Sequence, residues 1–169
     1  MLRGGGSRRG IEIISILDEP SAMKTMILVW GSSNRGKSQS IKRLAESMPF
    51  TSIIRQWHNN DYDSYVIGTI EDRYGKDRIV GIESQGDPEY EQENWINACI
   101  SADCEIIVAA SRSYGKTYVD AIRLANDNGY AVIELTTFFH ENTPILPNGV
   151  DLRDVFAESM ISLVKQCLE

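Results

Sequence analysis

The chain alternates between short apolar runs and longer amphipathic segments. Three runs are almost continuously apolar, namely Thr25–Trp30, Glu105–Ala110 and Ala131–Thr136. Runs of this length and character are typical of parallel strands that are covered on both faces. Three segments with a more mixed pattern also predict strands, namely Ser52–Trp57, Tyr65–Glu71 and Arg78–Glu83. The last two flank a polar, glycine-containing connection, which predicts a β-hairpin insertion around residues 65–83.

Four further segments carry apolar residues at helical spacing, which predicts helices over Lys37–Met48, Pro88–Ala102, Lys116–Asn128 and Asp151–Leu168. Pro88 suits a first helical turn, and Asp151 is the expected N-cap of the last helix. Strands and helices therefore follow one another in an α/β order. We expect three layers, with a mainly parallel sheet between helices on both faces and right-handed crossovers between parallel strands.

The composition is that of one ordinary folded domain. Of the 169 residues, 42% are apolar and 24% are charged, fractions that are typical of globular proteins. The net charge of −7 disfavours nucleic acid and membrane surfaces as partners, because phosphate-rich surfaces repel an acidic protein. The segment 31–43 nevertheless contains four basic residues and no acidic one. This local excess of positive charge is compatible with a small phosphate ligand.

Neither the three cysteines nor the two histidines show the spacing of a zinc site. No apolar run approaches the roughly 18 residues of a membrane span, and the cysteine pattern is typical of a reducing compartment. We therefore expect a cytoplasmic protein. Residues 1–22 contain a short apolar run interrupted by Glu12 and no small-residue cleavage site. We expect them to be a leader or tag, and the domain to comprise residues 23–169.

The most specific pattern is the segment from Gly31 to Ser38, Gly-Ser-Ser-Asn-Arg-Gly-Lys-Ser, which fits G-x-x-x-x-G-K-[ST]. It stands between a predicted strand and a predicted helix. The glycines allow successive backbone N–H groups to converge on phosphate oxygens, and the helix directs its positive end to the same place. Lys37 supplies a point charge for the β- and γ-phosphates, and the Ser38 hydroxyl is a ligand for Mg²⁺. An ordinary glycine-rich turn is the alternative.

This segment resembles the Walker A motif of P-loop NTPases, and the element order is similar to that superfamily. The resemblance implies binding of ATP or GTP with Mg²⁺. It places the nucleotide on residues 31–39, namely Gly31, Ser32, Ser33, Asn34, Arg35, Gly36, Lys37, Ser38 and Gln39. The N-K-x-D pattern by which GTPases select guanine is absent, so ATP is the preferred nucleotide.

A second segment, from Ala110 to Thr117, matches the same pattern with Ala in place of the first Gly. It also follows a predicted strand and opens a predicted helix, so it is an alternative phosphate site. A loop at the same edge of the sheet explains it too. Because Ala110 resists a positive φ, we favour the first motif. Arg112 and Lys116 remain candidates for contacting bound phosphates, and Arg112 is our candidate catalytic cation.

The resemblance also implies an acidic residue at the end of another strand, which holds Mg²⁺ directly or through water. Glu83 is the candidate, and residues 83–86 (Glu-Ser-Gln-Gly) are similar to the D-x-x-G switch of P-loop GTPases, with Glu for Asp. Asp87 is the rival metal ligand, and Gly86 would let the loop move when a γ-phosphate arrives. An acidic turn without metal explains the same residues equally well.

Asp61 and Asp63 follow the second predicted strand. Their D-x-D pattern resembles that of small-molecule kinases of the shikimate-kinase type, in which a carboxylate orients or deprotonates the acceptor hydroxyl. A solvated turn is the alternative.

Two functions follow from these motifs. The first is an ATP-dependent phosphotransferase for a small molecule, in which Lys37, Asp61, Asp63 and Arg112 carry the chemistry. The second is a nucleotide-dependent switch or regulatory ATPase that acts on a protein partner through the loop from Glu83 to Asp87. The transferase requires a substrate pocket near Asp61–Asp63 and Arg112, whereas the switch requires an exposed, movable loop over residues 84–88. A degenerate fold without nucleotide binding is disfavoured, because Lys37 and Ser38 are both present.

Overall fold

The computed structural model of the chain describes residues 23–32, 36–58, 63–87 and 91–169. Its strands are β1 (Thr25–Trp30), β2 (Ser52–His58), β3 (Ser64–Glu71), β4 (Asp77–Glu83), β5 (Ile106–Ser111) and β6 (Ala131–Leu135). Its helices are α1 (Lys37–Ser47), α2 (Gln92–Ser101), α3 (Lys116–Asp127) and α4 (Leu152–Cys167). The predicted strands and helices are confirmed to within one residue at most ends. Helix α2 differs, because it begins at Gln92, and residues 88–90 lie outside the described part.

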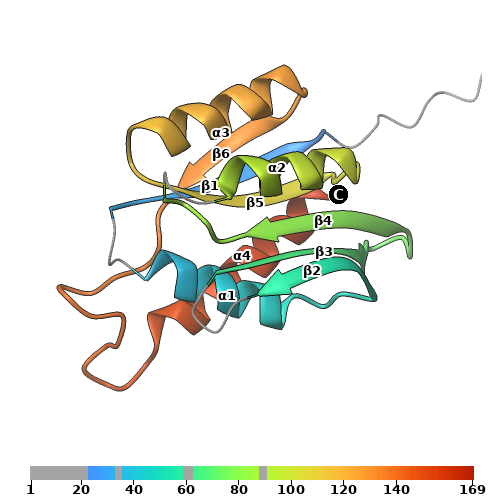
Figure 1. The fold of residues 1–169 in the computed structure, drawn as a ribbon. Coiled ribbons are helices and arrows are strands. Elements are labelled where there is room, and N and C mark those ends of the chain that lie inside the picture. Colours follow the sequence, from blue (N-terminus) through green and yellow to red (C-terminus); the bar gives the residue numbers. More distant parts are fainter. Residues whose placement is uncertain (1–22, 33–35, 59–62, 88–90) are drawn as a thin grey trace, which may run out of the picture.

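The six strands form one mixed sheet in the order β2-β3-β4-β5-β1-β6 (Figure 1). The pairs β4–β5, β5–β1 and β1–β6 are parallel. The pairs β2–β3 and β3–β4 are antiparallel. The predicted mainly parallel sheet is therefore confirmed, and the antiparallel section fits the predicted hairpin insertion.

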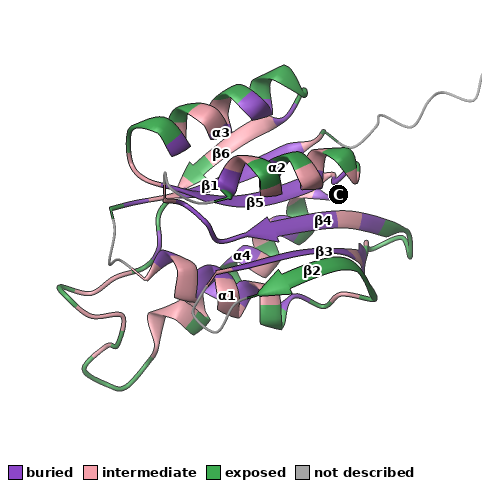
Figure 2. Ribbon diagram, in the orientation of Figure 1, coloured by how far each residue is buried: buried purple, intermediate pink, exposed green. Residues whose placement is uncertain are grey.

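Helices cover both faces of the sheet, with α1 and α4 on one side and α2 and α3 on the other (Figure 1). The buried strand β1 contributes side chains to the hydrophobic cores on both faces of the sheet, because successive side chains of a strand point to opposite faces. Ile27 and Val29 pack in the core beneath α1 and α4, and Met26 and Leu28 pack beneath α2 and α3. Burial is concentrated in the central strands β1, β3, β4 and β5 (Figure 2).

The turn between β3 and β4 is held by a buried ion-pair network. The Asp72 carboxylate accepts hydrogen bonds from the backbone N–H groups of Tyr74 and Lys76 at 2.9 and 3.0 Å. Arg78 donates to Asp72 at 2.9 Å, to Glu105 and to the carbonyl of Leu168 at 3.3 Å. The network thus ties the hairpin to β5 and to the end of α4, and fixes the direction in which β4 enters the sheet.

The edge strand β2 differs from the other strands, because all seven of its residues are exposed. The helices α2 and α3 lie over β4, β5, β1 and β6, so the part of this face formed by β2 is not covered by a helix (Figures 1 and 2). Three large apolar side chains of this strand, Ile53, Ile54 and Trp57, are exposed by 46%, 53% and 47%. An edge of this kind leaves room for a ligand beside α2.

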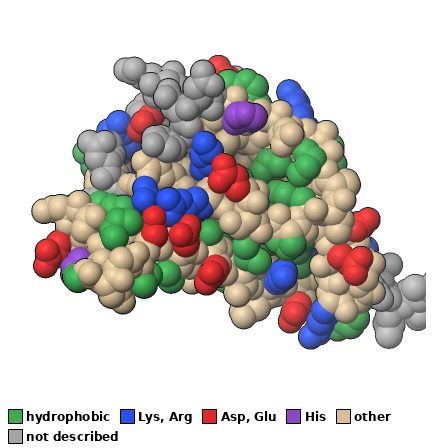
Figure 3. Space-filling model, turned by 90° about the horizontal axis from the view of Figure 1, so that it is seen from below, with side chains coloured by type: hydrophobic (Ala, Val, Ile, Leu, Met, Phe, Trp, Pro, Cys, Tyr) green, Lys and Arg blue, Asp and Glu red, His purple; other side chains and the backbone are tan. Residues whose placement is uncertain are grey.

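Helix α4 begins at the predicted N-cap. The Asp151 carboxylate accepts a hydrogen bond from the backbone N–H of Arg153 at 3.0 Å, and it also accepts from the side chains of Arg153 and Arg43. On the lower side of the molecule, acidic and basic side chains lie next to each other instead of forming a patch of one sign (Figure 3). Within residues 23–32, 36–58, 63–87 and 91–169, no helix is long and apolar enough to cross a membrane.

We expect Asp151→Ala to lower the free energy of unfolding by about 1 kcal/mol at neutral pH, the usual effect of losing an N-cap. Asp151→Asn keeps the cap but removes the charge that faces Arg153 and Arg43. The hydrogen bond from Arg153 lowers the pKa of Asp151, so its charge stabilises the fold above the unfolded pKa. This stabilisation is lost as the pH falls through the folded pKa. The difference in thermal stability between wild type and Asp151→Asn should therefore be constant above about pH 4 and shrink steadily as the pH falls below that value, whereas a difference that does not change with pH would contradict this assignment.

Candidate functional site

The predicted site residues gather at one edge of the sheet. Because β1, β4, β5 and β6 run in the same direction, their carboxyl ends meet at the left side of Figure 1, where α1 and α3 begin. The antiparallel strand β3 starts at this edge with Ser64, which pairs with the end of β2. In open α/β sheets, ligands bind outside the carboxyl ends of the strands. The edge is therefore the place where a ligand is expected.

Helix α1 begins directly after Gly36, whose φ of 72° and ψ of 18° lie in the left-handed region that glycine adopts without strain. No side chain caps this helix, and its first turn contains no acidic residue. The first N–H groups of such a helix lack intrahelical partners and attract anions. Gly31 is buried, and a Cβ there would lie 3.4 Å from Thr136 Oγ1 and 3.7 Å from Lys37 Cδ. The loop thus passes close to the segment after β6.

Lys37, the first residue of α1, is buried and turned back toward the strand ends. Its Nζ donates to the carbonyl oxygen of Gly31 at 2.6 Å and to that of Ser111 at 2.8 Å. Burial lowers the pKa of this ammonium group, and the nearby Asp87 carboxylate opposes the shift. An ammonium group has three N–H donors, and the two carbonyls use two of them. One donor remains for a further acceptor at the ends of β1 and β5.

Ser38 joins α1 to the end of β4. Its hydroxyl donates to the carbonyl of Ser84 at 3.3 Å. Ser84 in turn is bound to the start of β3, because its N–H donates to the carbonyl of Ser64 at 3.0 Å and its Oγ accepts from the N–H of Ser64 at 2.8 Å. The predicted metal ligand Ser38 therefore lies beside the loop that follows Glu83.

Glu83 is completely buried and braces the ends of two strands. Its Oε1 accepts from the backbone N–H of Ala110 at 2.7 Å, and its Oε2 accepts from that of Gln85 at 2.8 Å. Burial raises the pKa of Glu83 well above its usual value; the charge of Asp63 adds to this shift, and Lys37 opposes it. Asp63 and Lys37 thus both lie within electrostatic reach of Glu83.

The loop after β4 is packed against β5. A Cβ at Gly86 would lie 3.1 Å from the backbone nitrogen of Ser111 and 3.2 Å from the carbonyl carbon of Ala110, so the close approach requires glycine. The next residue, Asp87, accepts a hydrogen bond from Arg112 Nε at 3.0 Å. Both side chains of this pair are partly exposed, and both contribute to the electrostatic field at Lys37.

The structure therefore brings together Lys37, Ser38, Asp63, Glu83, Asp87 and Arg112 from separate elements. Ser32 is exposed beside Gly31, and Gln39 is turned to the start of α4, where it accepts a hydrogen bond from Arg153. The remaining predicted site residues, namely Ser33, Asn34, Arg35 and Asp61, lie outside the described residues, as does the expected leader 1–22. Arg153 had no sequence signal of its own, because its place beside Gln39 depends on the packing of α4 against α1.

The second motif, from Ala110 to Thr117, has a different geometry. Lys116 is exposed and forms an ion pair with Asp120 in the next turn of α3. The Thr117 hydroxyl accepts from the backbone N–H of Arg112 at 3.1 Å. The Gln92 amide donates to the carbonyls of Ala110 and Thr117 at 2.7 and 3.0 Å. The backbone of this loop is thus engaged by Thr117 and by Gln92 of α2, and its lysine is exposed and paired with Asp120 instead of being buried between strand ends.

Comparison of the chain with models of known protein families, with curated proteins and with solved structures found no match. What is shown is an α/β domain with a six-strand mixed sheet and a group of polar side chains at its carboxyl edge.

The described residues contain no group of three or more His, Cys, Asp or Glu side chains that could hold a metal ion. Mg²⁺ does not require such a group, because it keeps several waters and is commonly bound by one or two carboxylates together with substrate phosphates. Each Glu83 oxygen accepts one hydrogen bond from a backbone N–H and keeps a second lone pair. Ser38 with Glu83 or Asp87 is therefore compatible with a magnesium ion that arrives with a nucleotide.

Proposed function

We propose that the protein is a Mg²⁺-dependent P-loop phosphotransferase that uses ATP and a small-molecule acceptor. The position of Lys37 carries the proposal. A buried ammonium group at the start of a helix, introduced by a left-handed glycine, is held between the ends of β1 and β5. Uncapped helix N–H groups and a lysine at one place are the arrangement that binds phosphate in Walker A loops.

The chemistry assigned to the site is transfer of the γ-phosphoryl group. The bond between the γ-phosphorus and the β–γ bridging oxygen breaks and ADP leaves. A new phosphorus–oxygen bond forms to the acceptor hydroxyl, whose proton passes to Asp63. Lys37 and Arg112 stabilise the charge on the transferred group. Ser38 with Glu83 or Asp87 would hold a Mg²⁺ ion that arrives with ATP, and this ion would neutralise charge on the phosphates.

Two observations favour a transferase over a regulatory switch. Ser84, Gln85 and Gly86 are buried, whereas a switch requires this loop to be exposed and movable. A pocket lined by Trp57, Tyr65 and Gln85 also lies at the ends of β2 and β3, where the acceptor is expected. Arg112 does not line this pocket but reaches the edge through its pair with Asp87.

The proposal is tested by incubating the protein with Mg²⁺ and γ-labelled ATP, with and without a small-molecule fraction of a cell extract. We expect a labelled organic product in addition to inorganic phosphate. Asp63→Asn should lower its rate of formation by about 100-fold or more, the usual contribution of a positioned base. Asp77→Asn is the matched control, because Asp77 is exposed at the opposite end of β4.

Release of inorganic phosphate alone, at the same rate with and without the fraction, would contradict a transferase and favour the regulatory ATPase. The same reaction with labelled GTP tests the preference for ATP. We predicted this preference because the sequence lacks the N-K-x-D pattern by which GTPases select guanine.

A further inference from the structure

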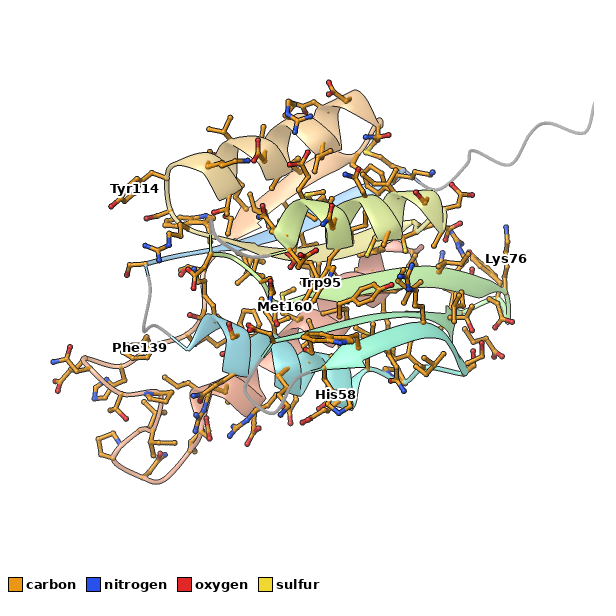
Figure 4. All side chains as sticks on the ribbon, viewed as in Figure 1. His58, Lys76, Trp95, Tyr114, Phe139 and Met160 are labelled. Atoms are coloured by element: carbon orange, nitrogen blue, oxygen red, sulfur yellow. The ribbon has the colours of Figure 1, made fainter. Side chains whose placement is uncertain are left out.

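A pocket of about 460 Å³ lies between α2 and the antiparallel strands β2 and β3. Its lining comes from these elements and from the loops at their ends, namely Arg55, Gln56, Trp57, Tyr65, Gln85, Glu91, Asn94, Trp95 and Ala98. The pocket exists because α2 covers β4 and β5 but not the edge strand β2. In Figure 4 the labelled Trp95 stands between α2 and the sheet, above the end of β2 that carries His58.

Aromatic rings form a continuous wall of this pocket. Trp95 stacks on Tyr65 with ring centroids 5.4 Å apart and an interplanar angle of 26°, and Trp57 meets Trp95 at 5.2 Å and 60°. The guanidinium of Arg55 lies 5.6 Å from the centre of the Tyr65 ring. Trp57 remains 47% exposed, although a large aromatic side chain is normally buried. A flat ligand would find a stacking surface here.

The polar groups of the pocket are mainly amides. Gln85 Oε1 accepts from the backbone N–H of Glu91 at 2.7 Å, and Asn94 Nδ2 donates to the Glu91 carboxylate at 2.6 Å. The amide nitrogen of Gln85 and the amide oxygen of Asn94 have no hydrogen-bond partner among the described residues. The amide nitrogen of Gln85 supplies N–H donors and the amide oxygen of Asn94 supplies an acceptor, a combination that suits the edge of a heterocyclic base.

Tyr65 takes part in the pocket through its ring. Its side chain is 4% exposed and lines the pocket. Its hydroxyl is buried without a hydrogen-bond partner among the residues that the structure describes. This oxygen is inaccessible from the pocket, so Tyr65 contributes its ring to the aromatic wall and does not offer its hydroxyl to a ligand.

The pocket also adjoins the candidate site. Trp57 and Tyr65 are paired across β2 and β3, close to Asp63 at the start of β3. Tyr65 in turn pairs with Glu83 across β3 and β4, and Gln85 donates its backbone N–H to Glu83. Asp63, the carboxylate that we assign as the base, does not line the pocket but stands two positions before Tyr65 in the chain and lies within electrostatic reach of Glu83.

We propose that this pocket binds a nucleoside, with its base stacked on Trp57 and Trp95 and its sugar directed to Asp63. The claim that this nucleoside is the phosphoryl acceptor depends on the proposed function, whereas its binding does not. Every base can stack on the aromatic side chains, because every base has a π-face. The amide groups of Gln85 and Asn94 contact the edge of the base.

Calorimetric titration of the full chain with adenosine, guanosine, cytidine and uridine, each without ATP, tests the binding. We expect at least one nucleoside to bind with a Kd below about 1 mM and ribose not to bind. Trp57→Ala should weaken binding at least about fivefold, the low end of what a stacked aromatic contributes. Tyr114→Ala is the matched control, because Tyr114 is 79% exposed and does not line the pocket, so it should bind like wild type.

Three results would overturn the proposal: no binding of any of the four nucleosides, equal binding of ribose, or unchanged binding by a folded Trp57→Ala variant. The outcome does not depend on the Gly31–Ser38 loop, since no triphosphate is present. Adding Mg-ATP to the nucleoside that binds then tests its role. Formation of the nucleoside monophosphate supports the acceptor assignment, and binding without transfer contradicts that assignment alone.

Discussion

Replacing Lys37 by methionine is expected to abolish the stabilisation of the protein by Mg-ATP. A ligand present at about 100 times its Kd stabilises the native state by about 2.7 kcal/mol. For a domain of this size, such a gain raises Tm by roughly 5–10 °C. Methionine fills a similar volume without the ammonium group, so the variant loses the charge that faces the phosphates. Because burial lowers the pKa of Lys37, removing this charge should not unfold the free protein.

The matched control is Lys116→Met in the second motif. Lys116 is exposed and paired with Asp120, so its loss should leave the Mg-ATP shift unchanged. Differential scanning calorimetry of wild type and both variants, with and without Mg-ATP and Mg-GTP, distinguishes the two motifs. A shift that disappears in Lys116→Met but persists in Lys37→Met would place the phosphate site at the second motif. Absence of a shift in the wild type with either nucleotide would contradict the proposed function as a whole.

The second large effect is expected from Gly81→Ala in β4. A Cβ at this position would overlap Cys99 Sγ and lie 3.1 Å from Cys104 Sγ. Both cysteines are fully buried, so the new methyl group forces α2 away from the sheet. Overpacking of this kind costs about 1–3 kcal/mol, which corresponds to a fall in Tm of roughly 3–10 °C. Chemical denaturation monitored by circular dichroism measures the change.

The double variant Gly81→Ala/Cys99→Ala tests the cause of this loss. If the clash with the Cys99 sulfur is responsible, the two substitutions should interact favourably, and the double variant should be more stable than the sum of the single effects predicts. Strictly additive losses would instead indicate that Gly81 is required by the backbone of β4. The result bears on the site, because Glu83 lies two residues further along the same face of this strand.

Much of the candidate site could be predicted from local sequence. The eight residues from Gly31 to Ser38 carry their own requirements, since a left-handed turn needs glycine at position 36 and the following lysine and serine are adjacent in the chain. The structure places Gly36 in that conformation. The sequence favoured Lys37 over Lys116 only through the glycine at the start of the first motif, in whose place the second has Ala110. The structure distinguishes the two lysines by their environment, because Lys37 is enclosed by the ends of β1 and β5 whereas Lys116 begins a helix at the surface.

Residues that depend on sheet order were harder to predict. The sequence made Glu83 the candidate metal ligand and Asp87 its rival, but it could not show that Glu83 is buried against the backbone of β5 and that Asp87 pairs with Arg112. The pocket between α2 and β2 had no signal at all, because Trp57 and Trp95 are 38 positions apart in the chain. They meet only when β2 becomes an edge strand next to β3.

The apolar and polar pattern by itself determined the strands, the helices and their α/β order, and the glycine-lysine motif marked two candidate phosphate loops, of which the first was favoured. Periodicity is a local property, so it could be seen without knowledge of the fold. The tertiary structure alone decided the order β2-β3-β4-β5-β1-β6, the burial of Lys37 and Glu83, and the aromatic pocket. Each of these features depends on contacts between segments that are distant in the chain. Such contacts contribute to stability only after the sheet has formed and the helices have packed on it.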